Sequence, residues 1–159
     1  EKNVLLLTGA GQIGMAIARR MGYGMKIVIG DRKQENAHTV SKIMNEAGFD
    51  TVAEEMDLSS RSSIQSFIEK GKKYGPLTMM VNAAGVSPSQ ASIETILRVD
   101  LYGTAVLLEE VGKEIAPGGV GITISSQSGH RMPQLTPQED EQLACTPTEE
   151  LLHLAILQP

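Results

Sequence analysis

Three glycines near the start of the chain have the spacing of a phosphate-binding loop. Gly9, Gly11 and Gly14 form the pattern G-x-G-x-x-G, directly after a short apolar run and at the start of a helix-like stretch. In such a loop the first glycine permits a tight turn, the second lets the backbone approach a pyrophosphate, and the third allows close packing of helix on strand. The amides around Gln12 and Ile13 belong to the helix N-terminus, where free N–H groups favour an anion. The pattern predicts a dinucleotide-binding loop; the alternative is that the glycines serve only turn geometry.

An acidic residue follows the second apolar run. Asp31 could accept hydrogen bonds from both hydroxyls of an adenosine ribose, and its charge would repel a 2′-phosphate. This favours NAD over NADP as the cofactor. The neighbouring Arg32 and Lys33 leave another interpretation open, because a basic side chain here could cover a 2′-phosphate. In a third interpretation, Asp31 and Arg32 only cap the next helix.

Strand and helix signals alternate along the first 125 residues. The expected strands are short and apolar, and a helix-like stretch separates each from the next. Strands arranged in this way form a parallel sheet through right-handed crossovers, with helices on both faces. We therefore predict an α/β fold, a Rossmann-type doubly wound parallel sheet. The expected strands are 3–7, 26–30, 51–54, 77–81 and 119–125, and the expected helices are 12–21, 34–46, 60–73 and 92–114.

The last of these helices carries a regular apolar pattern. Its apolar residues recur at three- to four-residue steps, which predicts one stripe packed against the sheet. The stripe consists of Ile93, Ile96, Leu97, Leu101 and Leu107.

Four short motifs occur in order at the ends of successive expected strands. Together they resemble the short-chain dehydrogenase/reductase family, and the resemblance covers residues 3–126. The motifs are "TGAGQIG" at 8–14, "MDL" at 56–58, "VNAAG" at 81–85 and "ITISS" at 122–126.

The resemblance implies further cofactor-binding residues. By this likeness Asp57 and Leu58 lie beside the adenine ring. The family's Asn-Asn-Ala-Gly motif after the fourth strand is represented here by Asn82, Ala83, Ala84 and Gly85.

The sequence also departs from the family pattern. The glycine loop is one residue tighter than the commonest family form, and Ala83 replaces the second asparagine of its motif. Asp100 stands where the family usually has an asparagine that helps order the active-site lysine and a proton-relay water. An ionised aspartate accepts hydrogen bonds but cannot donate them. Asp100 is therefore either catalytic or an ordinary residue on a helix flank.

Ser126 is the best catalytic candidate in the chain. A hydroxyl at the carboxyl end of the fifth strand would lie in the crevice where open parallel sheets bind ligands. There it could hydrogen-bond a substrate carbonyl or alcohol oxygen during hydride transfer and stabilise charge on that oxygen. Ser125 would point to the other side of the strand, and Ser128 is a weaker candidate for the same role. Alternatively, these serines only satisfy backbone groups at the strand end.

The family's Tyr-x-x-x-Lys pair has no match in this sequence. The three tyrosines, Tyr23, Tyr74 and Tyr102, are followed four positions later by isoleucine, threonine and valine. In the family the lysine charge lowers the pKa of the tyrosine, which then serves as acid and base. We expect this pair to lie in a continuation of the chain, and the fold to be incomplete at its C-terminal end.

The sequence predicts two parts, a nucleotide-binding region at 1–129 and an acidic helical insertion or lid at 130–159. The pairs Thr136-Pro137 and Thr146-Pro147 are each followed by acids, which predicts the starts of two short helices. The segment resembles an insertion that covers the substrate in some family members. His130, Arg131 and Met132 would then line the substrate site or else form a surface loop.

Composition excludes several functional classes. The net charge is −5, and residues 132–159 hold five acids and no Lys or Arg, so binding to nucleic acid is not expected. A single cysteine excludes an internal disulfide and fits a reducing compartment. Neither a membrane-spanning run nor a leader is recognisable, and the three histidines lack metal-binding spacing, so we expect a cytoplasmic protein without membrane or metal partners.

These observations predict an NAD(P)-dependent oxidoreductase of the short-chain type. It would move hydride between the nicotinamide and a small alcohol or carbonyl substrate. The alternative is a protein or fragment that binds a dinucleotide without catalysis, because it lacks the Tyr-Lys pair. The resemblance also implies a homodimer or homotetramer.

Overall fold

The computed structural model describes residues 1–158 and divides the chain into two compact units. The first unit spans Glu1–Ile124 and contains the sheet. The second unit spans Ser125–Pro159 and consists of short helices.

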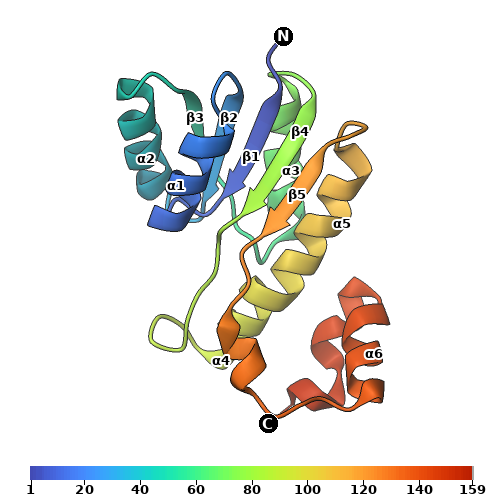
Figure 1. Cartoon of the computed structure of the whole chain (residues 1–159). Helices are drawn as coiled ribbons and strands as arrows, with labels where there is room; N and C mark the ends of the chain where they lie inside the picture. The colour runs from blue at the N-terminus through green and yellow to red at the C-terminus, as the bar shows by residue number, and fades with distance from the viewer. Residues whose placement is uncertain (159) are drawn as a thin grey trace. The chain divides into compact units, whose positions relative to one another are not determined.

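Five parallel strands form one sheet in the first unit, in the order β3-β2-β1-β4-β5 (Figure 1). This order confirms the predicted Rossmann-type parallel sheet. The strand order reverses beside β1, and the carboxyl ends of β1 and β4 therefore form the point where such sheets bind ligands. The strands are β1 Val4–Thr8, β2 Lys26–Asp31, β3 Asp50–Glu55, β4 Leu77–Asn82 and β5 Val120–Thr123. The first four agree with the prediction to within one residue at each end, whereas β5 is shorter than the predicted 119–125.

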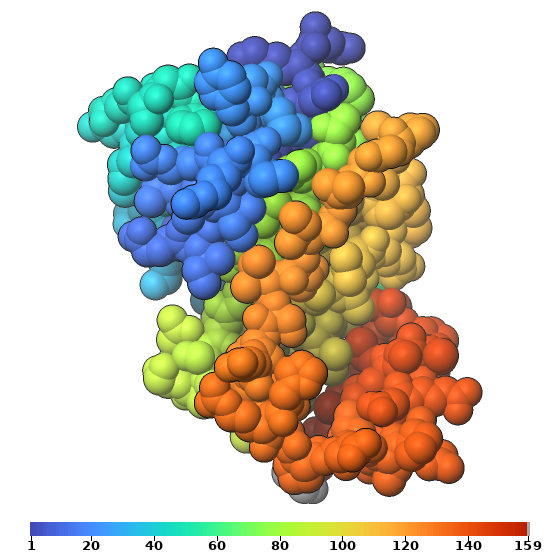
Figure 2. Space-filling model, viewed as in Figure 1, coloured from blue at the N-terminus to red at the C-terminus, as the bar shows by residue number. Residues whose placement is uncertain are grey.

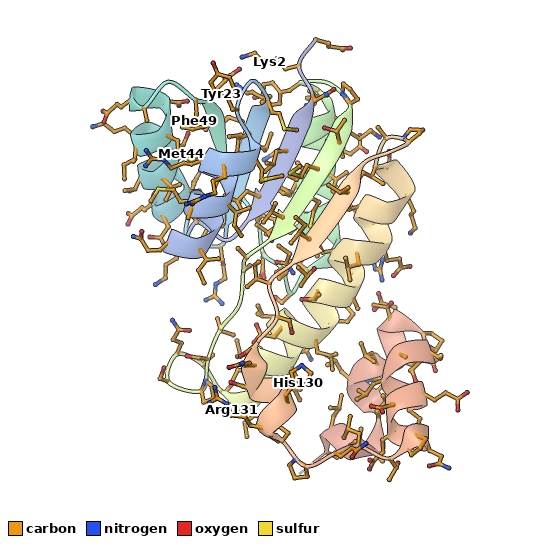
Figure 3. The ribbon with its side chains drawn as sticks, viewed as in Figure 1. Lys2, Tyr23, Met44, Phe49, His130 and Arg131 are labelled. Atoms are coloured by element: carbon orange, nitrogen blue, oxygen red, sulfur yellow. The ribbon has the colours of Figure 1, made fainter. Side chains whose placement is uncertain are left out.

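Helices cover both faces of the sheet because β1 is apolar on both sides. Leu5 and Leu7 face one buried cluster, which includes residues of α1 and α2, while Val4 and Leu6 face another, which includes residues of α3 and α5 (Figure 1). Phe49 packs against the first cluster (Figure 3). These helices are α1 Gln12–Met21, α2 Gln34–Glu46, α3 Arg61–Lys72 and α5 Thr104–Glu114.

The predicted single helix at 92–114 is wrong in its first half. The structure has a short α4 at Ile93–Ile96, a π-helical segment η1 at Leu97–Gly103, and then α5. A π turn contains more residues than an α turn. Apolar residues spaced for a regular α-helix therefore do not stay on one face of the helix when the segment contains a π turn. Of the predicted stripe, Leu107 is buried whereas Ile93 is 76% exposed.

The edge strand β5 is exposed along its whole length. Val120 and Ile122 lie on the strand and are 47% and 38% exposed, and Ile124, directly after the strand, is 39% exposed. Figure 2 shows this strand as an orange band at the surface. The chain therefore presents an apolar sheet edge.

An ion-pair network joins α3 to α5. Arg61 binds Glu109 and Glu110, and Lys113 also contacts Glu110. Glu110 is among the buried charged residues, and the Arg61 guanidinium beside it lowers the pKa of its carboxyl. This network fixes the helix pair on one face of the sheet.

The second unit begins with the 3₁₀ helix η2, Gln127–Arg131, which carries the exposed His130 and Arg131 (Figure 3). The helix predicted after Thr136 is confirmed as α6 Pro137–Cys145, with a capping box between Thr136 and Glu139. The short helix predicted after Thr146 is also present, as the 3₁₀ helix η3 Thr148–His153. A further short 3₁₀ helix, η4, spans Ala155–Leu157.

Candidate functional site

A cavity of about 260 Å³ opens at the carboxyl ends of β1 to β4 in the first unit. The segments after these four strands, together with parts of α2 and η1, form its walls. Of the residues predicted to bind a cofactor, the cavity brings together Gly9, Gly11, Asp31, Arg32, Asp57, Leu58, Ala83, Ala84 and Gly85.

The three glycines of the loop meet different requirements. Gly9 has φ +89°, and a Cβ there would lie 2.6 Å from the Ala84 nitrogen. A Cβ on Gly14 would lie 2.6 Å from the Gly9 oxygen, because α1 packs closely on β1. A Cβ on Gly11, by contrast, would have no atom of the described chain within 4 Å, and Gly11 lines the cavity. Gly9 and Gly14 are therefore required by the fold, whereas Gly11 leaves room for a ligand.

Asp31 connects the second strand to the glycine loop. One carboxylate oxygen accepts a hydrogen bond from the Ala10 amide at 2.9 Å, and the other accepts one from the Lys33 amide at 2.8 Å. The second contact is a local turn before α2; the N-cap of that helix is Lys33, with no side-chain cap, so neither Asp31 nor Arg32 caps it as the third interpretation had it. A carboxylate has about four acceptor positions in total, so Asp31 can still accept from a ribose hydroxyl.

Asp57 and Leu58 form another wall, after β3. An oxygen of Asp57 accepts hydrogen bonds from the amide and hydroxyl of Ser59, at 2.9 and 2.7 Å. The Asp57 amide donates to the Ser63 hydroxyl at 2.9 Å. Leu58 is 4% exposed and belongs to the apolar cluster on the α3 side. The turn at the cavity is therefore held by α3.

Asn82 holds the loop after β4, which forms part of the cavity wall. Its side chain is buried, and its Oδ1 accepts hydrogen bonds from the Thr8 hydroxyl at 2.6 Å and the Ala84 amide at 3.3 Å. Its Nδ2 donates to the Thr104 hydroxyl at 3.3 Å. Asn82 therefore links β1, the loop after β4 and α5.

The remaining predicted residues lie in different places. Gln12 and Ile13 begin α1, and Ile13 is 60% exposed. Asp100 lies in η1, and its Oδ1 accepts a hydrogen bond from the Val86 amide at 3.0 Å. Ser126 belongs to the second unit, where its hydroxyl accepts a hydrogen bond from the Ser128 amide at 3.1 Å and caps η2. This contact agrees with the alternative interpretation of the sequence, in which the serine hydroxyl satisfies a backbone group.

Several residues that line the cavity were not predicted from the sequence. Asn36, Val86 and Val99 line the cavity, and Met56 lies beside Asp57. Val86 directly follows the predicted Gly85, so extending the motif by one residue would have found it. Asn36 and Val99 come from helices whose orientation the motifs do not specify.

In residues 1–158, no helix is long and apolar enough to cross a membrane. Within the same residues, no group of three or more His, Cys, Asp or Glu side chains is placed to hold a metal ion.

Comparison with known proteins gives a family match over most of the chain. Residues 2–137 match the family model described as short chain dehydrogenase. The chain is 36% identical over 158 residues to the short-chain dehydrogenase/reductase bsc3 of Alternaria brassicicola, an alignment that covers 99% of this chain and 58% of the relative. It is 27% identical over 144 residues to tropinone reductase-like 3 of Erythroxylum coca, covering 84% and 56%. The chain thus spans little more than half the length of these relatives.

Solved structures show the same fold. An actinorhodin polyketide ketoreductase determined with NADPH superimposes with a TM-score of 0.70 at 25% identity, over 95% of this chain and 61% of the other. An NAD⁺-bound xylitol dehydrogenase superimposes with a TM-score of 0.73 at 22% identity, over 82% and 55%.

Proposed function

Because the chain belongs to the short-chain dehydrogenase/reductase family, we propose that its first unit binds NAD for an oxidoreductase reaction. In this reaction, bound NAD accepts or supplies hydride as an alcohol and a carbonyl interconvert. The observation that carries the proposal is the cavity between the Gly9–Gly11 backbone and Asp31.

The residues around the cavity fit a dinucleotide. The open space above Gly11 lies at the N-terminus of α1, where free backbone amides and the helix dipole favour a pyrophosphate. Asp31 would hold the adenosine ribose, and Asp57 and Leu58 would border the adenine. Ala83, Ala84 and Gly85 would line the opposite wall with little side-chain bulk.

We favour NAD over NADP on electrostatic grounds. The Asp31 carboxylate would lie close to a 2′-phosphate and repel it. Arg32 also lines the cavity and would attract the same phosphate. The carboxylate is the better anchored of the two, because two backbone amides hold it. NADP is therefore proposed to bind more weakly rather than not at all.

Ser126 is our proposed catalytic residue. Its hydroxyl would donate a hydrogen bond to the substrate oxygen and stabilise the charge that develops there. No tyrosine of this sequence is followed four residues later by a lysine, so the acid–base role is assigned to none of its residues. The substrate class, a small alcohol or carbonyl compound, is proposed from the family.

The resemblance also leads us to propose a homodimer or homotetramer, and the single cysteine leads us to propose a reducing compartment, the cytoplasm. Light scattering coupled to size exclusion would test the assembly. A single species of 17.1 kDa would contradict it.

Calorimetric titration with NAD⁺, NADP⁺ and ADP would test the binding proposal. We expect saturable binding of NAD⁺ at one site per chain, weaker binding of NADP⁺, and competition by ADP, which carries the same diphosphate. Absence of saturation with both dinucleotides, in a sample with a cooperative unfolding transition, would overturn the proposal. Tighter binding of NADP⁺ would overturn only the choice of cofactor.

A further inference from the structure

The outer edge of β3 is bonded to a side chain of α2. Strand β3 is the last strand on its side of the sheet and pairs only with β2. The backbone N–H and C=O groups that point away from β2 therefore have no strand partner. The Thr51 amide donates a hydrogen bond to Asn45 Oδ1 at 2.8 Å, and Asn45 Nδ2 donates to the Thr51 carbonyl oxygen at 3.2 Å. One side-chain amide thus binds both backbone groups of Thr51, as the main chain of a neighbouring strand would.

Asn45 reaches the strand because the chain turns sharply after α2. It lies in the last turn of this helix, six positions before Thr51. Gly48 has φ +91°, a conformation that favours glycine, and it lets the chain reverse so that α2 lies beside β3 (Figure 1). The fold itself therefore brings the Asn45 amide to the sheet edge.

Two buried hydroxyls fix the orientation of this amide. Ser41 and Thr51 are each 7% exposed, and the Thr51 hydroxyl donates to the Ser41 carbonyl oxygen at 3.0 Å. A hydroxyl has one proton, so the Ser41 hydroxyl is the donor in its 2.7 Å contact with Thr51 Oγ1. Asn45 Nδ2 also lies 3.5 Å from Ser41 Oγ. The NH₂ end of the amide thus faces two oxygens, and the reverse orientation would place Oδ1 against them.

The charges of β3 lie at its two ends. Asp50 begins the strand, and Glu54 and Glu55 end it. Charged side chains at a sheet edge discourage pairing with another chain. The middle of the strand, residues 51–53, is uncharged and contains threonine and valine, which have high β propensity. Asn45 therefore binds the part of the edge that the charges of the strand leave unprotected.

We propose that Asn45 closes the β3 edge to strand addition by a second copy of this chain. Its amide occupies both outward-facing backbone groups of Thr51, so an approaching strand cannot pair there unless Asn45 moves away. The contact is thus an autoinhibitory one, built into the fold. The proposal concerns the sheet edge alone and does not depend on dinucleotide binding. The homodimer or homotetramer proposed above would form through other surfaces.

Asn45→Ala tests the proposal, because alanine supplies neither the donor nor the acceptor. Hydrogen exchange of the Thr51 amide, measured by NMR below the unfolding transition, is expected to speed up at least about tenfold. Light scattering under the same conditions is expected to show larger species forming at least about fivefold faster than in the unsubstituted chain. In these larger species the Thr51 amide should regain protection from exchange, because it then bonds to the added strand.

Two further variants separate opening of the edge from a loss of stability. Ser41→Ala removes a buried hydroxyl contact at the same junction but keeps the pair between Asn45 and Thr51, so its association rate is expected to stay within about twofold of the unsubstituted chain. Asn45→Asp loses the donor to the Thr51 carbonyl but places a charge at the edge. Its association rate is also expected to stay within about twofold, because the charge opposes strand addition.

Unchanged exchange of the Thr51 amide in Asn45→Ala, or no increase in its association, would overturn the proposal. Association of Ser41→Ala or Asn45→Asp as fast as that of Asn45→Ala would also overturn it, as would larger species in which the Thr51 amide stays unprotected. If Asn45→Ala does not fold, the unsubstituted chain gives a second measurement. Its Thr51 amide should exchange at least about tenfold more slowly than that of Ala53, the next one on the outer side of β3. Equal exchange of the two amides would contradict the protection by Asn45.

Discussion

The carboxylate of Asp31, at the end of β2, accepts a hydrogen bond at 2.9 Å from the amide of Ala10, inside the glycine loop after β1. Its other oxygen accepts from Lys33, which precedes α2. One side chain thus restrains the loop that we propose holds the pyrophosphate and also forms part of the proposed ribose site. Cofactor choice and loop geometry are therefore linked through Asp31.

Asp31→Asn is expected to weaken NAD⁺ binding about tenfold and to reduce the preference for NAD⁺ over NADP⁺. The asparagine is neutral and has only one acceptor oxygen, so one of the two amides loses its acceptor and the other loses its charged partner; a hydrogen bond to a charged group is worth about 1.5–3 kcal/mol. Loss of the charge also removes repulsion of a 2′-phosphate. Dissociation constants for both dinucleotides, measured by calorimetry, test this. Glu35→Gln, which removes an exposed carboxylate in the first turn of α2, is the control; an unchanged preference in Asp31→Asn would contradict the ribose assignment.

Gly14→Ala is expected to destabilise the fold by about 1–3 kcal/mol, because the new methyl group overpacks the α1–β1 contact. Its Cβ would lie 2.6 Å from the Gly9 oxygen and 3.1 Å from Leu7 Cδ1. Urea unfolding measures the change. Gly112→Ala is the matched control. Gly112 also lies in a helix, α5, and a Cβ there would meet no atom of the described residues within 4 Å beyond its own helix and chain neighbours. This control should be neutral or stabilise by up to about 1 kcal/mol, because alanine has the higher helix propensity; equal effects of the two substitutions would show that the contact is not tight.

Gly11→Ala is expected to act on binding rather than on stability. A Cβ at this position would meet no described atom within 4 Å beyond its chain neighbours, so the unfolding free energy should fall by no more than about 1 kcal/mol, the cost of alanine at the N-cap of α1. The methyl group would occupy the approach of the pyrophosphate, and affinity for NAD⁺ should fall at least tenfold. Titration of NAD⁺ into this variant measures the loss. Unchanged affinity would place the diphosphate elsewhere.

Much of the sheet and its ligand edge could be predicted because the signals are local. Short apolar runs with intervening helices specify a parallel sheet, and parallel strands bring their carboxyl ends to one edge. Gly9, Asp31, Asp57 and Ala84 therefore line one cavity although they are far apart in the chain.

The missed features depend on geometry that spacing does not encode. An apolar period of 3.6 residues assumes a regular α-helix, and the π turn at Leu97–Gly103 breaks that assumption. The contact of Asp100 with Val86, fourteen positions away, depends on how that turn orients the side chain. Asn82 matched a family motif, yet its three hydrogen-bond partners became visible only in the structure.

Asn82→Ala is expected to destabilise the chain by about 1–3 kcal/mol. The substitution removes the acceptor of the Thr8 hydroxyl and the Ala84 amide, and the buried donors left without a partner carry most of the cost. Urea unfolding at neutral pH measures it. Asn36→Ala, at an exposed position in α2 that lines the cavity, is the control and should change stability by less than about 0.5 kcal/mol. Similar losses in both variants would argue against a supporting role for Asn82.

Glu110→Gln is expected to lower stability at neutral pH, by an amount that shrinks in acid. The Arg61 guanidinium lowers the pKa of Glu110 below its ordinary 4.5, so its carboxylate stabilises the folded chain above that pH and loses this effect as pH falls through the lowered pKa. The difference in unfolding free energy between the unsubstituted chain and Glu110→Gln should therefore be largest near pH 7 and narrow below about pH 4.5. Urea unfolding across this range measures it, with Glu46→Gln as the control, because Glu46 is 67% exposed and 4.0 Å from Lys42. That surface pair should contribute little to the unfolding free energy at any pH. If the loss of unfolding free energy in Glu110→Gln is the same at every pH, packing rather than charge accounts for the effect of Glu110.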